Sequence, residues 1–68
     1  MYTWKQAKAY AEILGATIRK TSYGDIAVRP ISGGEQVYFA SDLEDAIGTL
    51  RIMLGSHPRI ADAENELQ

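Results

Sequence analysis

Hydrophobic positions repeat with a helical period near the start of the chain and again after its middle. The first repeat places on one stripe the residues Trp4, Ala7, Ala11 and Leu14. The second runs through residues 43–54 at the same spacing. Apolar residues three and four positions apart lie on one face of an α-helix. The pattern therefore predicts helices over residues 4–14 and 43–54. It favours Trp4 as a core residue, the alternative being a partner-binding residue near the helix start.

Both predicted helices have start and stop signals. Thr3 and Gln6 have the spacing of a capping box, in which each side chain bonds the other residue's backbone N–H. The segment 41–44, SDLE, has the same spacing, and its acidic residues suit the positive end of a helix dipole. Gly15 and Gly55 follow the last apolar residues, where helices often end.

Alternation replaces the helical period between these helices. Residues 17–21, 26–29 and 36–40 are rich in β-branched and aromatic side chains, and short turns with glycine separate them. Short connections favour antiparallel pairing of successive strands. The predicted fold class is therefore α+β in the order α-β-β-β-α, a three-stranded antiparallel meander with two helices packed on one face.

The register of the strands decides which residues lie on the outer face of the sheet. We expect the inward set to hold Ile18, Ile26, Val28, Val37 and Phe39. The outward set would then hold Thr17, Arg19, Thr21, Ala27, Arg29, Gln36 and Tyr38. A shift by one residue in a strand exchanges its two faces.

The segment after Gly55 differs in character from the rest. A break at residues 56–58 precedes a polar, acidic stretch whose apolar residues at helical spacing are Ile60, Ala63 and Leu67. So few apolar contacts are a weak basis for a helix. We expect residues 1–55 to form a single compact α+β domain. Residues 56–68 are predicted to be an acidic C-terminal tail or a short helix, with a frayed tail favoured.

Composition limits stability and location. A chain of 68 residues without cysteine has neither disulfides nor thiolate metal sites, and a core of this size rarely supplies more than ~3–5 kcal/mol. Self-association as a homodimer would add stability. The chain has no apolar run of the ~18 residues that a membrane span needs, and no signal-peptide pattern. A cytoplasmic protein without membrane contact is expected.

The inventory of reactive groups argues against an enzyme. The chain has one histidine, His57, beside a predicted helix end, and no pairing of a nucleophile with a base is recognisable. Asp42, Glu44 and Asp45 are explained as cap and first-turn residues rather than as metal ligands. No catalytic residue, cofactor or metal is therefore predicted.

The order and size of the elements invite comparison with double-stranded RNA-binding domains. Those domains meet phosphates with a basic start of the second helix. Here that start is DLED at residues 42–45, which would repel phosphates. The formal net charge of −2 also hides a division, since residues 1–40 hold five basic and three acidic residues, and residues 41–68 two and six.

Candidate binding residues lie on the predicted outer face of the sheet. Arg19, Arg29 and Tyr38 would share that face, with Tyr23 at its rim. Arg and Tyr are enriched at interface hot spots, although a solvated sheet face also carries such residues. The same residues would also suit single-stranded nucleic acid, because basic groups hold the backbone and aromatic rings stack on bases.

Three segments resemble a pattern found in small uncharacterised bacterial proteins encoded near phage or plasmid genes: LGATIRKTSYGDIAVRP, GGE and YFASDLEDAIGTLRIM. The likeness covers residues 7–54 and implies a mobile-element accessory protein without implying an activity. We expect a small non-enzymatic binding module that acts through a protein partner, as a phage- or plasmid-encoded modulator or host-defence inhibitor. The alternative is a nucleic-acid-binding regulator that uses the outer face of the sheet.

Overall fold

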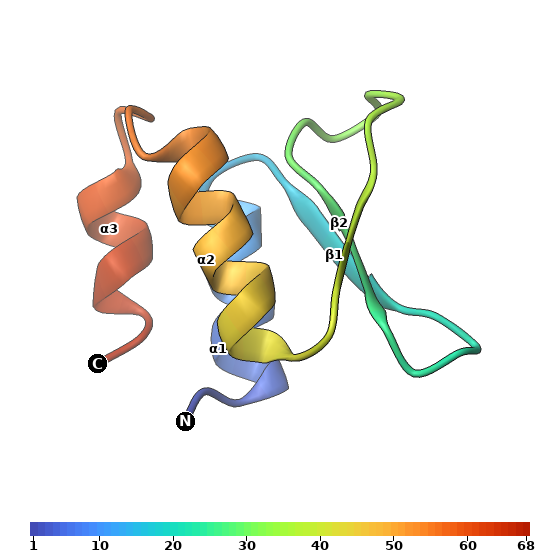
Figure 1. The fold of residues 1–68 in the computed structure, drawn as a ribbon. Coiled ribbons are helices and arrows are strands. Elements are labelled where there is room, and N and C mark those ends of the chain that lie inside the picture. Colours follow the sequence, from blue (N-terminus) through green and yellow to red (C-terminus); the bar gives the residue numbers. More distant parts are fainter.

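The chain runs through one helix, three strands and two further helices (Figure 1). The computed structural model describes all of residues 1–68. Its elements are α1 (Trp4–Ile13), β1 (Thr17–Lys20), β2 (Ile26–Arg29), β3 (Tyr38–Ala40), α2 (Leu43–Leu54) and α3 (Ile60–Asn65). The sheet is antiparallel with strand order β1-β2-β3. The predicted α+β fold with a three-stranded antiparallel sheet is confirmed.

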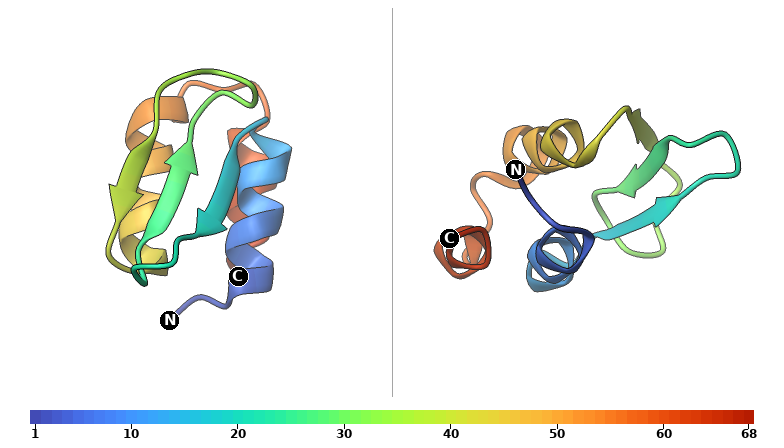
Figure 2. Two further views of the ribbon diagram at one scale, coloured as in Figure 1. Left: turned by 90° about the vertical axis from the view of Figure 1, so that its right-hand side faces the viewer. Right: turned by 90° about the horizontal axis from the view of Figure 1, so that it is seen from below.

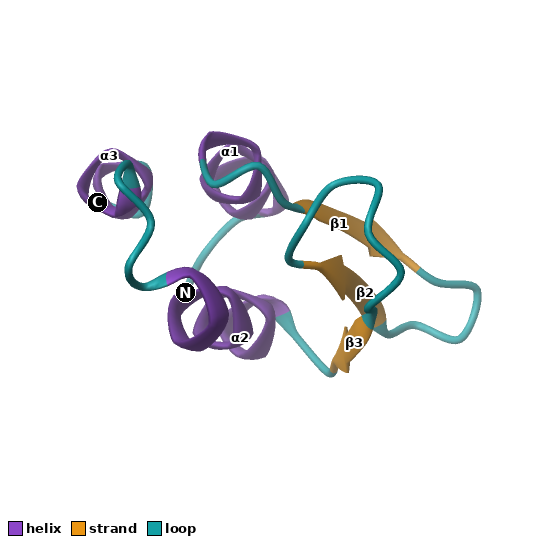
Figure 3. Ribbon diagram, turned by 90° about the horizontal axis from the view of Figure 1, so that it is seen from above, coloured by secondary structure: helices purple, strands orange, loops and turns teal.

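The elements form three layers. Helices α1 and α2 lie side by side against one face of the sheet, and α3 lies on the far side of that pair (Figures 1 and 3). The largest fully buried side chains are Tyr10, Val28, Ile47 and Leu50, from α1, β2 and α2. No helix covers the opposite face of the sheet (Figure 2). None of the helices is long and apolar enough to cross a membrane.

Helix α1 begins as predicted and buries the predicted apolar stripe except for Trp4, the first of its four residues. The Gln6 amide donates to Thr3 Oγ1 over 3.1 Å, and the Thr3 amide donates to Gln6 Oε1 over 2.9 Å, which confirms the capping box. The prediction of Trp4 as a core residue is wrong, because its side chain is 37% exposed. Tyr10 is fully buried and lies at the centre of the buried stripe, so that stripe is rotated away from Trp4.

The register confirms the predicted faces of β1 and β2 and reverses that of β3. One row across the sheet joins Arg19, Ala27 and Phe39, and the next joins Ile18, Val28 and Tyr38. Val28 is fully buried beneath the helices, so Tyr38 lies on the helix-facing side at the edge of the sheet. Phe39 and Val37, two residues before it, lie on the outer face, which is the position predicted for Tyr38.

Ala40 explains this reversal. It pairs with Ile26 and is 2% exposed, two residues before the N-cap of α2. A small side chain suits this position because the strand passes directly into the helix that packs on the sheet. Once Ala40 faces inward, the two-residue period of a strand places Phe39 outward.

Of the two residues at the start of α2 that the sequence offers as its cap, Ser41 and Asp42, the second is used. Asp42 is the N-cap, and its carboxylate accepts from the Asp45 amide over 2.8 Å. The Asp45 carboxylate in turn accepts from the Ser41 amide over 3.1 Å. Both carboxylates therefore cap backbone amides at the N-terminal start of α2.

Gly48 provides a direct test of the packing around α2. A methyl group added there would meet no atom within 4 Å apart from the adjoining backbone of its own helix and its two chain neighbours. Because glycine inside a helix costs about 1 kcal/mol relative to alanine, Gly48→Ala should raise the free energy of unfolding by up to about that amount in urea denaturation. Gly24→Ala is the control and should lower it, since Gly24 has φ of +90°. A loss of stability in Gly48→Ala would contradict the open space.

The C-terminal segment forms helix α3, so the favoured prediction of a frayed tail is wrong and the alternative of a short helix holds. Ala63 is fully buried, and Ile60 and Leu67 pack against the core. In addition to these three apolar contacts, a polar contact holds α3 against the other helices. The acidic composition of the segment gives no sign of it.

That polar contact is made by Glu64, which joins all three helices. Its carboxylate accepts from Arg51 Nε on α2 over 2.8 Å and from Arg51 Nη2 over 2.6 Å. It also accepts from the buried Tyr10 hydroxyl on α1. The hydrogen bonds from Arg51 hold the pKa of Glu64 below its usual value. Burial, followed by the contact with Glu64, raises the pKa of Tyr10.

Candidate interaction surface on the sheet

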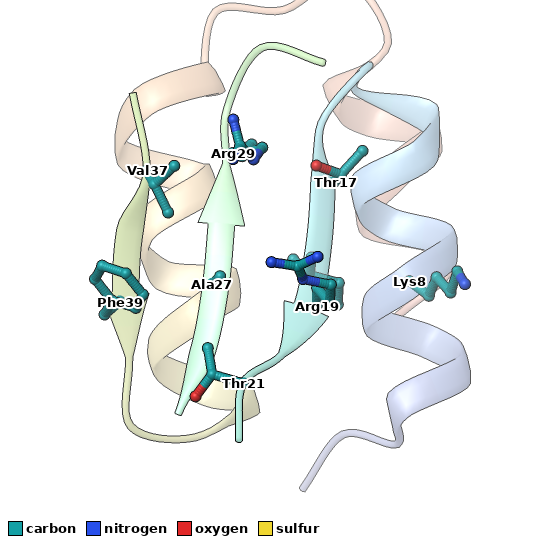
Figure 4. A pocket seen from close by; sticks show the side chains of 9 residues that line it. Lys8, Thr17, Arg19, Thr21, Ala27, Arg29, Val37 and Phe39 are labelled. Atoms are coloured by element: carbon teal, nitrogen blue, oxygen red, sulfur yellow. The ribbon is translucent and has the colours of Figure 1, made fainter. Parts of the chain in front are cut away.

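An open hollow of about 500 Å³ lies on the uncovered face of the sheet (Figure 4). We call it the sheet hollow. Its lining comprises Lys8, Thr17, Ile18, Arg19, Thr21, Ala27, Arg29, Val37 and Phe39. All three strands contribute, and α1 adds Lys8 at one side. The hollow therefore exists only in the folded sheet and is not visible as a run of residues in the sequence.

Ala27 forms the floor of the sheet hollow. It lies between Arg19 and Phe39 in one row across the strands. Although it is only 9% exposed, it lies outside the core cluster beneath the sheet. Its methyl group lies on the outer side of the sheet, with longer side chains on both flanks. The short side chain at this position is what leaves the space between them.

The two sides of the sheet hollow differ chemically. On the β3 side lie Val37 and Phe39, and the ring of Phe39 is 69% exposed. On the other side lie Arg19 from β1 and Lys8 from α1 (Figure 4). No acidic residue lines the hollow. The surface is therefore apolar along one edge and basic along the other.

The two arginines predicted for this face are both present but are engaged differently. Arg29 Nη1 donates to the Gly34 carbonyl over 2.8 Å and so holds the loop between β2 and β3. Arg19 makes no hydrogen bond or salt bridge within the chain. Its guanidinium is thus the better placed of the two to bind another molecule.

The two predicted aromatic residues have different outcomes. Tyr23 lies in the turn between β1 and β2 and is 91% exposed, beside a second depression that shares Arg19, Thr21 and Phe39 with the sheet hollow. It is therefore at the rim, as predicted. Tyr38 does not lie on the outer face, and Phe39 takes that place. The sequence pattern missed Phe39 because the register of β3 was inverted, and it missed Lys8 because packing between α1 and β1 brings it there.

The single histidine of the chain has a structural partner. His57 Nδ1 accepts from the Arg59 amide over 3.0 Å, in the connection between α2 and α3. No group of three His, Asp or Glu side chains is arranged to hold a metal ion. The sheet hollow offers the basic side chains of Lys8, Arg19 and Arg29 and the exposed aromatic residue Phe39.

Comparison of the chain with models of protein families, with curated proteins and with solved structures finds no match.

Proposed function

We propose that this protein is a small non-enzymatic binding module that acts by covering a surface of a protein partner with the sheet hollow. The observation that carries the proposal is the pair of Arg19 and Phe39 on either side of Ala27. One side chain is an unpaired cation and the other an exposed ring. Arginine and aromatic residues supply much of the binding energy at protein interfaces.

A single-stranded nucleic acid is the second candidate ligand. Lys8 and Arg19 would contact phosphates, and Phe39 is exposed enough to stack on a base. The apolar side of the sheet hollow makes no phosphate contact, and the chain carries a net charge of −2. Because affinity for nucleic acid depends mainly on neutralised phosphates, a protein partner suits this surface better.

The size of the module fits a role as a modulator of another protein's activity. We place this role in the cytoplasm and regard a phage- or plasmid-encoded modulator, such as a host-defence inhibitor, as the setting that the resemblance noted above favours. A second copy of the chain is the other protein partner to test.

Photo-crosslinking in the source cells tests the proposal. A benzophenone amino acid replaces Phe39, and the control variant carries it at Ile52, which is 85% exposed on α2. We expect a discrete protein adduct from position 39 that is absent from position 52. An adduct of twice the chain mass would identify a homodimer, and a nuclease-sensitive adduct would favour nucleic acid. Equal labelling from both positions, or none from either, would overturn the proposal.

A further inference from the structure

We infer that the partner presents an acidic, amphipathic segment, with an apolar side chain over Ala27 and a carboxylate on Arg19. The inference rests on the proposed function and adds the chemistry of the segment that binds. It follows from the division of the sheet hollow into an apolar and a basic side.

The apolar side defines one half of the segment. Neighbouring strands lie about 4.8 Å apart, so the backbones of Arg19 and Phe39, two strands apart, are separated by about 10 Å. The methyl group of Ala27 between them leaves room for a side chain from outside. A leucine or phenylalanine placed there would contact Phe39 and remove its exposed ring from water.

The basic side defines the other half. Arg19 has no carboxylate partner in the chain, and Lys8 stands on the same side. Asp25 lines the neighbouring depression together with Arg19 but makes no salt bridge with this arginine. A carboxylate can accept two parallel hydrogen bonds from a guanidinium, which gives direction as well as attraction.

The position of Arg29 strengthens the charge argument. Its hydrogen bond to the Gly34 carbonyl fixes the guanidinium near the sheet hollow without neutralising it. Three cations and no anion therefore line the hollow itself, whereas acidic residues line only the depressions beside it. A basic segment would be repelled there, whereas an acidic one gains from each cation.

Fluorescence polarisation with defined probes tests the inference. Two short labelled peptides carry the same alternating leucines, one with glutamate between them and the other with lysine. The third probe is single-stranded oligothymidylate. We expect the glutamate peptide to bind and the lysine peptide not to bind. Arg19→Glu should weaken the binding of the glutamate peptide by at least about tenfold. Phe39→Ala and Ala27→Leu should also weaken its binding.

Lys5→Glu is the matched control for charge. Lys5 lies on α1 outside the sheet hollow, so the same change of two charges should alter binding by less than about twofold at moderate salt. Circular dichroism establishes that each variant is folded. Phe39→Ala keeps the test valid if Ala27→Leu does not fold, since Phe39 lies outside the core.

The results separate this inference from the proposed function. Absence of binding by the glutamate peptide, equal binding of the two peptides, or no effect of Arg19→Glu would overturn the inference. A partner adduct at position 39 would still stand in that case and keep the proposed function. Tight, steeply salt-dependent binding of oligothymidylate without an adduct to protein would overturn both.

Discussion

Replacement of Ile47 by alanine is expected to leave most of the chain unfolded at room temperature. Ile47 is 1% exposed and lies in the core on the buried side of α2. Truncation of a buried isoleucine to alanine costs about 2–5 kcal/mol, because apolar contacts are lost and a cavity remains. The whole core of a chain this small rarely supplies more than about 3–5 kcal/mol. Urea denaturation followed by circular dichroism measures the loss.

Ile52→Ala is the matched control for this prediction. Ile52 lies on the same helix, five residues on, but its side chain projects into solvent. Its truncation should change the free energy of unfolding by no more than about 0.5 kcal/mol. Similar losses in the two variants would mean that α2 does not bury the face that contains Ile47.

Removal of the Glu64 carboxylate is expected to have the second largest effect. Glu64→Ala leaves the buried Tyr10 hydroxyl and the Arg51 guanidinium without their shared acceptor. A polar group left without its partner in a folded protein costs about 1–3 kcal/mol. Thermal denaturation should show a lower midpoint. Asp62→Ala is the control, because the Arg59–Asp62 pair is solvent-exposed and should contribute less than about 1 kcal/mol.

The same carboxylate predicts the dependence of stability on pH. Its pKa is lowered by folding, so the stabilisation is fully present above the unfolded value of about 4.3 and is lost as the pH falls through the folded value. Tyr10 acts at the other end, since its raised pKa means that stability falls above about pH 10 as only the unfolded chain ionises. Glu64→Gln should flatten the acid slope. An unchanged slope in that variant would contradict the role of Glu64.

Periodicity was sufficient to predict α1, α2 and the three strands, because each has a continuous face that packs on its neighbours. Periodicity was insufficient where contacts between distant parts of the chain decide which residues are buried. Tyr10 belongs to the core because α3 brings Glu64 over its hydroxyl, a contact across 54 residues of sequence. The sequence gives no local signal for that contact, and the acidic segment around Glu64 resembles a solvated tail.

The candidate site was predictable only in part, for a related reason. Arg19 and Arg29 lie where predicted because the short hairpin and the inward Ile18 fix the register of β1 and β2. The register of β3 depends on how Ala40 meets α2, which outweighs the apolar character of Phe39. The outer face therefore carries Phe39 instead of the predicted Tyr38. It still combines basic residues with an aromatic one, but the aromatic residue is a different one.

The three layers also determine how the molecule can be immobilised on a surface. Both chain ends lie on the helical side, with the sheet at the opposite side (Figures 1 and 3). A biotin attached after Gln68 would therefore immobilise the molecule through its helical side. Arg19 and Phe39 on the sheet would then face the solution. Immobilised in this way, every copy would present the same surface, which favours the capture of weakly binding partners.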